Sequence, residues 1–253
     1  MAPILTSSSP ISVCTVNSCG YRSKKLLIRN LLLSDNISIL GLTDTLYSTP
    51  KVNNYNTIQG PLKTTAILVK TSIPVSPFTL PPSFNNLDLS AASIKINNIT
   101  IHIFSYYNRP LIPLDTDFLS FVASMPNTIL MGDFNARYIS FSDHHTNSNG
   151  TRLFNFLISS SLCRIPNCNP TFINYNGSSI PDHILIHQSL VPFFPYDCSI
   201  GTSITTDHLP LVALTNLITQ SNLPMLEKYN LKQPTGPISV PILMVPFSTL
   251  NLN

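Results

Sequence analysis

The 253-residue sequence predicts an α/β domain, and three patterns support this prediction. The chain opens with a strand, a helix and a second strand in succession. Between Thr64 and Tyr107, β-branched residues are frequent and apolar and polar positions alternate. Later apolar segments switch between helical and strand-like spacing. The chain therefore mixes hairpins with strand–helix units.

The first part of the chain predicts a strand, a helix and a strand. Ile11–Val16 is a short strand, and an Asn-Ser-Cys-Gly turn separates it from a helix over Ser23–Leu33. The apolar stripe of this helix consists of Leu27, Ile28, Leu31 and Leu32. A second strand, Ile37–Leu42, brings Asp44 just past its C-terminal end.

The middle of the chain predicts a hairpin, a helix and a buried strand. The segments SIKI and ITIHIF alternate and are separated by the turn dipeptide Asn97-Asn98, which indicates an antiparallel hairpin. Asp115–Met125 is expected to be helical, with Asp115 or Thr116 as its cap. This helix leads into the short buried strand Thr128–Met131.

The last part of the chain predicts one more helix and two strands. The helix is expected over Thr151–Leu162, and the strands over Asp182–His187 and Leu209–Thr215. The inward-facing residues of this helix are expected to be Leu153, Phe154, Leu157 and Ile158. After about Leu217 the periodicity gives way to a Pro-rich segment. We therefore expect an N-terminal extension at 1–10, one domain at 11–217, and a linker or disordered tail at 218–253.

Composition limits the classes of function. A hydrophobic content of 43% is enough for a sizeable core, and a formal charge of +3 is too small to indicate nucleic-acid binding by itself. The five cysteines are odd in number and lack CxxC spacing, so we interpret them as reduced thiols of an intracellular protein without a zinc site. The sequence shows no signal peptide and no membrane anchor.

Three separated fragments of the second half place an Asp at the edge of an apolar run. GDFNA spans Gly132–Ala136, SSIPDHIL spans Ser178–Leu185 and TTDHLPLV spans Thr205–Val212. Carboxylates, an amide and an imidazole can thus converge at the strand ends of one sheet. A metal-dependent site that cleaves phosphodiesters needs this set of groups.

Each fragment also has a simpler interpretation. Asp133 and Asn135 lie two apart and project to one face of an extended strand, where one could activate water and the other orient a phosphate; alternatively they form an Asx turn. His208 follows Asp207, and a buried carboxylate such as Asp182 could orient its imidazole. The alternative is a strand end with polar caps.

Hard oxygen ligands suit Mg²⁺, which takes only one or two protein carboxylates. Asp44 and Asp207 are the candidate ligands, Mn²⁺ is a second suitable ion, and no small-molecule cofactor is expected. His183, His144 and His145 are interpreted as surface or packing histidines rather than ligands.

In their order and spacing, the segments NSCG, LTDT, YYNRP, GDFNA, PDHIL and TDHLP resemble the endonuclease/exonuclease/phosphatase superfamily. The resemblance covers about Ile11 to Thr215 and is closest to the apurinic-endonuclease-like domain of non-LTR (LINE-type) retrotransposons. MGDFNAR followed by NSNGTRLFNFL at Asn147–Leu157 looks especially like those elements. The resemblance implies a four-layer α/β sandwich, in which two packed mixed β-sheets are flanked by helices and the site lies at one edge.

Residue by residue, the resemblance implies roles for the first half of the site. Asn17 would contact the phosphate or a metal-bound water, and Asp44 would occupy the position of a metal-binding glutamate. Tyr107 would approach the phosphate, with Tyr106 as the neighbouring alternative. Asp44 is one methylene shorter than the expected glutamate, which draws its carboxylate back from the ion.

The resemblance implies further roles in the second half. Asp133 would activate or position water, and Asn135 would steady the oxyanion. Asp182 would orient His208, which contacts the scissile phosphate, and Asp207 would serve the metal region.

The function that the resemblance implies is a metal-dependent DNA endonuclease that nicks target DNA for retrotransposon insertion, and we expect the chain to be a fragment of a LINE-type polyprotein. We expect a monomer that acts on DNA, in the nucleus, and not on membranes. Two alternatives stay open: a catalytically decayed nucleic-acid-binding remnant, and a phosphoesterase acting on a small phosphoester, because a fold does not fix its substrate.

Overall fold

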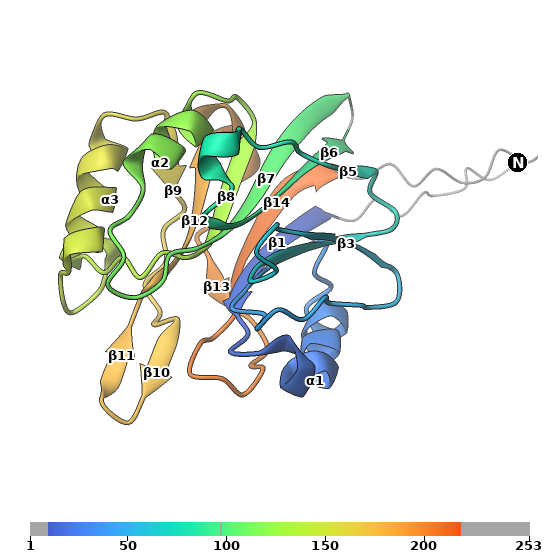
Figure 1. Ribbon diagram of the computed structural model, residues 1–253, viewed down its shortest axis with the longest axis horizontal. Helices are drawn as coiled ribbons and strands as arrows, with labels where there is room; N and C mark the ends of the chain where they lie inside the picture. Colours follow the sequence, from blue (N-terminus) through green and yellow to red (C-terminus); the bar gives the residue numbers. More distant parts are fainter. Residues whose placement is uncertain (1–9, 97, 219–253) are drawn as a thin grey trace, which may run out of the picture. The chain divides into compact units, whose positions relative to one another are not determined.

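Two six-stranded sheets pack face to face in the computed structural model, which describes residues 10–96 and 98–218 (Figure 1). Most of the predicted extension at 1–10 and of the tail at 218–253 lies outside the described residues, so these boundaries stay predictions. The strands that are described begin at Pro10 and end at Ile218.

The first sheet has the strand order β13-β14-β1-β2-β4-β3. Its central strands, β1 (Pro10–Asn17) and β2 (Ile39–Thr43), are parallel and are joined by helix α1 (Tyr21–Ser34). The outer strands pair antiparallel and are β3 (Tyr55–Gln59), β4 (Ala66–Lys70), β13 (Ser199–Ile200) and β14 (Leu211–Ile218).

The second sheet has the order β5-β6-β7-β8-β12-β9. Strands β7 (Ile99–Tyr107) and β8 (Thr128–Asp133) are parallel, and helix α2 (Thr116–Ala123) connects them. The other strands are β5 (Val75–Pro77), β6 (Asp88–Ile96), β9 (Leu162–Arg164) and β12 (Asp182–His187). Outside this sheet are helix α3 (Ser148–Ile158) and the hairpin β10 (Phe172–Asn174) and β11 (Gly177–Ser179). Short 3₁₀ turns are η1 (Pro82–Phe84), η2 (Ile139–Phe141) and η3 (Gln188–Phe193).

Three hydrophobic clusters fill the spaces between four layers, which confirms the predicted α/β sandwich. The cluster between the sheets includes Val13, Ile39, Ile103, Met131 and Ile184. The cluster beneath α2 and α3 includes Phe104, Phe118, Leu130 and Leu153. The cluster beneath α1 includes Ile28, Leu31, Leu40 and Leu68. Burying each such side chain stabilises the fold by about 1.5–3 kcal/mol before the entropy cost of ordering it.

Most element types were predicted correctly. The strand Asp182–His187 has the predicted bounds. Asp115 caps α2 as expected, because its carboxylate accepts a hydrogen bond of 2.8 Å from the Phe118 amide. Strands β6 and β7 form the predicted antiparallel hairpin, in which Asn98 has a φ of 66°. All five cysteines are free thiols, and no helix among the described residues is long and apolar enough to cross a bilayer.

The prediction for α3 was wrong at both ends. The helix starts before the predicted Thr151 because the Asn147 side chain accepts a hydrogen bond of 2.7 Å from the Gly150 amide and caps the first turn. Ile158, expected to face inward, is 70% exposed. It lies five residues after buried Leu153, about 140° around the helix axis. The strand expected over Leu209–Thr215 is also shifted and spans Leu211–Ile218.

Gly132 allows a close approach between neighbouring strands. It has a φ of +148°, and a Cβ there would lie 1.9 Å from the backbone oxygen of Tyr106 in β7. We expect Gly132→Ala to lower the free energy of unfolding by roughly 3 kcal/mol or more, measured by urea denaturation. The matched control is Gly177→Ala, because Gly177 has a φ of +135° but no atom within 4 Å of the added Cβ. Its cost should be only about 1 kcal/mol, and equal losses would contradict the steric explanation.

Candidate active site

The ends of several strands meet at one edge of the sandwich. Asn17 ends β1, and Asp133 ends β8. Strand register places Asp133 beside Tyr107 on one side and opposite Asp182 on the other. Strand pairing therefore brings Asp133, Tyr107 and Asp182 together, and the packing of the two sheets adds Asn17.

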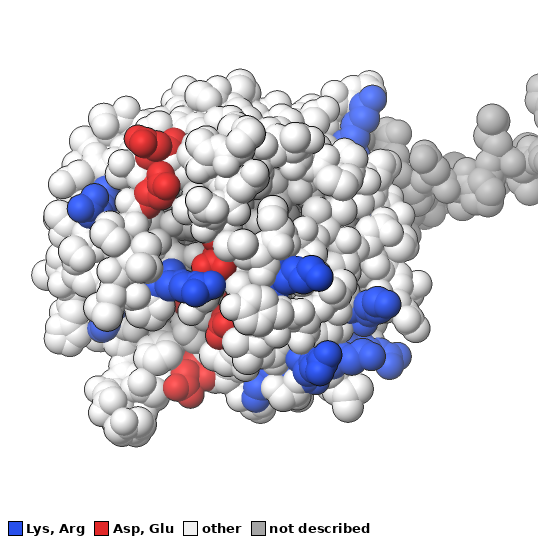
Figure 2. Space-filling view, viewed as in Figure 1, with Lys and Arg blue, Asp and Glu red and all other residues white. Residues whose placement is uncertain are grey.

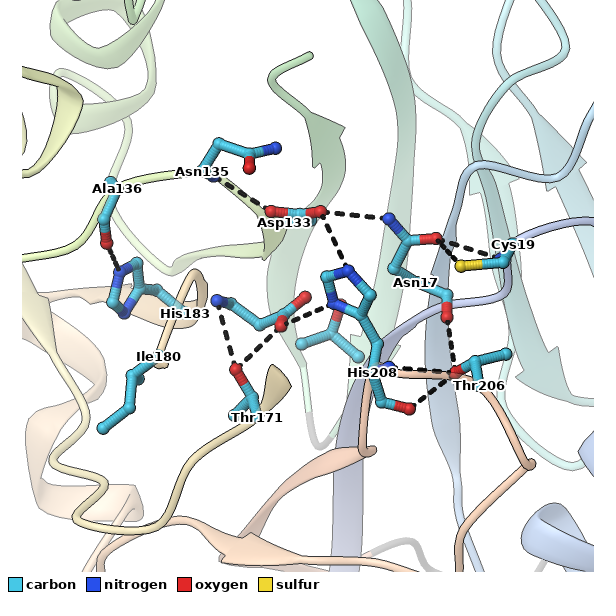
Figure 3. Close-up of polar contacts among 12 residues, drawn as sticks. Asn17, Cys19, Asp133, Asn135, Ala136, Thr171, Ile180, His183, Thr206 and His208 are labelled. Carbon is cyan, nitrogen blue, oxygen red and sulfur yellow. Dashed lines mark hydrogen bonds and ion pairs between the residues drawn. The ribbon is translucent and has the colours of Figure 1, made fainter. Parts of the chain in front are cut away.

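A chain of polar contacts runs through this edge (Figure 3). The Asn17 amide donates a hydrogen bond of 3.0 Å to Oδ2 of Asp133. Nε2 of His208 lies 3.8 Å from the same oxygen, and Nδ1 of His208 lies 3.0 Å from Oδ2 of Asp182. Thr171 donates a hydrogen bond of 2.7 Å to that second carboxylate. The imidazole thus lies between two carboxylates, and amide and hydroxyl donors hold the outer ends.

The environment of Asp133 raises its pKa to about 7. Burial is the largest cause, and the charge of Asp182 adds to it. The charge of His208 and hydrogen bonds from Asn17 and from the backbone of Asn135 oppose this rise. A carboxylate with a pKa near neutral can both hold and release a proton at physiological pH, as a general base must.

His208 has its pKa raised to about 9. Burial alone would lower the pKa of the imidazole, but the charge and hydrogen bond of Asp182 outweigh it, and Asp133 and Asp207 add to the rise. The imidazole is therefore positively charged at neutral pH, and both of its nitrogens carry protons. It can bind an anion at this edge.

The two carboxylates and the imidazole also have the spacing of a metal-binding cluster, but His208 would have to lose a proton to act as a ligand. Potential ligand atoms of Asp133, Asp182 and His208 all lie within 4.8 Å of one another. Oδ1 of Asp182 is buried and has no hydrogen-bond partner among the described residues. The metal ligands predicted from the sequence are Asp44 and Asp207, which are not members of this cluster.

Asp44 follows β2 directly and is held by its backbone. Its φ is 49°, and its carbonyl oxygen accepts hydrogen bonds from the Gly20 amide at 2.9 Å and the Ser18 hydroxyl at 3.1 Å. Its carboxylate makes no hydrogen bond or ion pair with any described residue. Burial raises the pKa of this carboxyl, although the charges of His208 and Arg109 oppose the rise. A partly desolvated carboxylate without a protein partner fits a cation ligand.

The surroundings of Cys19 show where negative charge gathers. Its thiol pKa is raised to about 11, first by burial and then by the charges of Asp44, Asp207 and Asp133, with Lys24 opposing. Three carboxylates therefore act on one region in front of the strand ends. Hard oxygen donors around a negative region fit a divalent cation such as Mg²⁺ or Mn²⁺ better than a soft metal.

The two adjacent tyrosines face opposite sides of β7. Tyr106 is 1% exposed and packs its ring 5.2 Å from the Phe118 ring, between centroids. Tyr107 is half-buried, and after burial itself the charges of Asp44 and Asp133 are the largest causes that raise its pKa. Tyr107 is therefore the tyrosine on the side of the site.

The simpler interpretations of Asp133–Asn135 and of His208 also hold in part. The Asn135 amide donates a hydrogen bond of 2.9 Å to Oδ1 of Asp133, which is an Asx turn. The Asn135 side chain donates a hydrogen bond of 2.8 Å to the carbonyl of Asn108. Thr206 accepts a hydrogen bond of 3.2 Å from the His208 amide. These turns hold the site residues in place, so turn and site are not exclusive alternatives.

Sequence reasoning missed Thr171 and the pair Arg109 and Asp88. Thr171 lies in a segment without periodicity, so no local pattern marks it. Arg109 donates two hydrogen bonds to Asp88, at 2.6 and 3.2 Å, and its side chain is 50% exposed. The arginine of YYNRP was the available signal, because it follows Tyr107 by two residues.

The other histidines lie outside the contact chain. His144 and His145 are exposed. His183 is buried, and its Nε2 lies 2.7 Å from the Ala136 carbonyl oxygen while its Nδ1 accepts a hydrogen bond of 3.1 Å from Arg164. It is a packing histidine, one of the two roles predicted.

Comparisons with known proteins found one matching family model and several similar folds. Residues 101–212 match the family model described as endonuclease-reverse transcriptase. No curated protein matches the chain. The endonuclease domain of TRAS1, a telomere-specific non-LTR retrotransposon, superposes with a TM-score of 0.67 at 17% identity, covering 83% of this chain and 99% of that one.

Two further solved structures share the fold. AP endonuclease LMAP from Leishmania major has a TM-score of 0.60 at 13% identity, covering 81% of this chain and 87% of its own. The 3′ phosphatase NExo from Neisseria, bound to product DNA hairpin, has a TM-score of 0.61 at 17% identity, covering 80% and 98%. These findings confirm the resemblance to the endonuclease/exonuclease/phosphatase superfamily and its sandwich fold.

Burial of His183 should make stability depend on pH. Burial and the charge of Arg164 lower its pKa to about 3, against about 6.5 in an unfolded chain. Between these values the unfolded state binds more protons, so stability falls as pH decreases from about 6.5 toward 3, by at most about 1.4 kcal/mol per pH unit.

We expect His183→Gln to reduce this pH dependence, measured by urea unfolding at pH 7.5, 5.5 and 4.5. Exposed His144→Gln is the matched control and should behave as the parent does. An unchanged pH dependence in His183→Gln would show that other groups cause it.

Proposed function

We propose that this chain, which has the fold of the endonuclease/exonuclease/phosphatase superfamily, is a metal-dependent DNA endonuclease that nicks target DNA for insertion of a LINE-type retrotransposon. The observation that carries the proposal is the contact chain from Asn17 through Asp133 and His208 to Asp182. The names of the similar proteins agree with it, since one is a retrotransposon endonuclease domain and another was bound to a DNA product.

The reaction is hydrolysis of one phosphodiester bond. A water oxygen bonds to phosphorus while the bond from phosphorus to the 3′ oxygen breaks, which leaves a 3′-hydroxyl and a 5′-phosphate. Asp133, with a pKa of about 7, takes the proton of the attacking water, and Asn17 holds the oxygen that receives it. The leaving 3′ oxygen gains a proton from solvent.

Other groups of the site balance the negative charge on the phosphate. The His208 imidazolium contacts a phosphate oxygen, and Asp182, itself held by Thr171, orients the ring. Asn135 steadies the oxyanion and Tyr107 approaches the phosphate. A divalent cation, Mg²⁺ or Mn²⁺, supplies further charge neutralisation when bound, and Asp44 and Asp207 are the carboxylates proposed to hold it.

The proposal includes a biological setting. A 3′-hydroxyl is the end that a reverse transcriptase extends, and the matching family model is described as endonuclease-reverse transcriptase. We propose that the domain belongs to a LINE-type polyprotein, and that it acts as a monomer on nuclear DNA.

One observation favours a second candidate. The carboxylate of Asp44 has no partner among the described residues and is one methylene shorter than the glutamate expected at its position, so the cation would be held too loosely for turnover. The chain would then be a catalytically decayed DNA-binding remnant. Binding of plasmid in EDTA without cleavage under any divalent ion would favour this candidate.

The first test is nicking of supercoiled plasmid. With Mg²⁺ we expect open circles, and EDTA should remove this product. Asp133→Asn and His208→Gln should each lower the rate by about 10²-fold to 10⁴-fold, because they remove the proposed base and the imidazolium. The matched controls, Asp117→Asn on α2 and His102→Gln near the opposite end of β7, should nick as the parent does. Nicking that persists in EDTA would refute the proposal.

The second test concerns ligand length at Asp44. Asp44→Glu should raise the Mg²⁺-dependent rate, because misplacing a ligand by about 1 Å can cost on the order of 100-fold. Asp44→Ala should abolish nicking. The φ of 49° suits Asp better than Glu, so the thermal midpoint of each variant must be measured as well. If Asp44→Ala folds and nicks normally, Asp44 is not a ligand.

A further inference from the structure

Two adjoining hollows lie beside the first turns of α1. One has a volume of about 370 Å³ and includes Cys19 at its border, and the other has a volume of about 430 Å³ and includes Lys51. Arg22, Tyr47 and Ser48 line both. The two hollows are therefore one groove between α1 and the loop after β2, which we name the α1 groove.

The α1 groove carries unbalanced positive charge. Arg22, Lys25 and Lys51 line it, and neither hollow is lined by an Asp or a Glu. The charged ends of these three side chains make no ion pair or hydrogen bond with any described residue. Arg22 and Lys25 lie three apart on one helix, where like charges repel. An anion bound between them would offset this repulsion.

The same imbalance is visible on the molecular surface. Lys and Arg side chains gather over α1 at the lower right of Figure 2, while the acidic side chains of that face lie above and to the left. The α1 groove is thus part of a positive surface beside the acidic centre of the site, rather than an isolated basic residue.

The α1 groove begins at the site itself. The Cys19 amide at its border donates a hydrogen bond of 3.0 Å to the side chain of Asn17, whose other end holds Asp133. An anion that occupies both the site and the α1 groove needs more than one phosphate, and the backbone of DNA supplies phosphates at a regular spacing. Tyr47, which is 67% exposed, adds an aromatic surface of the kind that stacks on bases or sugars.

We propose that the α1 groove binds the sugar–phosphate backbone of DNA on one side of the scissile bond. This rests on the proposed function, in which DNA is the substrate. Arg22, Lys25 and Lys51 contact phosphates, so they hold the DNA in place without reading its sequence. Each phosphate neutralised releases counterions and adds about 0.9 to the salt slope of binding.

The test is anisotropy of a fluorescent DNA duplex in EDTA, which prevents cleavage, over a range of salt concentrations. The variant Arg22→Gln/Lys25→Gln/Lys51→Gln should bind more weakly, and its slope of log K against log salt should be smaller by about 2.7, from three phosphates at about 0.9 each. With Mg²⁺, plasmid nicking by this variant should show a raised KM and an unchanged kcat.

The matched control is Lys70→Gln/Lys95→Gln/Arg152→Gln, which removes three positive charges outside the α1 groove. It should keep most of the parental affinity and salt slope. Equal losses in both variants would overturn the proposal, since general charge attraction would explain them. Parental affinity in the α1-groove variant, or a lower kcat at unchanged KM, would overturn it as well.

The outcomes separate this proposal from the proposed function. If the parent protein nicks DNA and the α1-groove variant binds DNA as the parent does, DNA binding by the α1 groove is refuted and the proposed endonuclease activity is supported. If the parent protein binds DNA through the α1 groove but never nicks it, the proposed endonuclease activity is refuted and DNA binding by the α1 groove is supported. A parent that neither binds nor nicks DNA refutes both.

Discussion

The rest of the structure depends on one buried interaction, in which the His208 imidazolium lies between the carboxylates of Asp133 and Asp182. An unpaired buried charge costs several kcal/mol, so two facing carboxylates need a cation between them. The pKa of His208, about 9, shows that the pair keeps the ring protonated. Asp133 belongs to the second sheet and Asn17, which donates to it, to the first. The site therefore joins the two sheets at the edge where it lies.

The same interaction fixes the loops around the site. Phe172 forms a β-bridge with His208, and their rings lie 4.9 Å apart. The Leu209 amide donates a hydrogen bond of 2.7 Å to the Thr171 carbonyl, next to the threonine hydroxyl that holds Asp182. The base of the β10–β11 hairpin is thus tied to the proposed catalytic histidine.

The sequence predicts the members of the site better than their surroundings. Asn17, Asp133 and Asp182 each adjoin a strand, and the register of a sheet then decides which of them meet. Tyr106 and Tyr107 could not be distinguished because neighbouring residues of a strand face opposite sides.

The misplaced start of α3 has a physical reason as well. Gly150, a poor helix former, lies in the first turn because a Cβ there would be 1.8 Å from the carbonyl oxygen of Arg137. Tertiary packing selected a residue that local propensity argues against. Thr171 was missed for a related reason, since its partner Asp182 lies across the hairpin and no local spacing records that contact.

The loop after β2 links the proposed metal ligand to the α1 groove. Asp44, Leu46 and Tyr47 all have positive φ values, of 49°, 48° and 60°, which cost non-glycine residues free energy. Hydrogen bonds of Thr45 offset that cost. Its backbone amide donates to the Thr64 carbonyl at 2.9 Å, and its hydroxyl donates to the Lys63 carbonyl at 2.8 Å. The part of the loop next to Asp44 is therefore held from its buried side, and the charged ends of Arg22, Lys25 and Lys51 make no hydrogen bond to it. Changing the charge of the α1 groove should therefore leave Asp44 in place. DNA binding by the groove and cation binding by Asp44 are then separable properties of one loop.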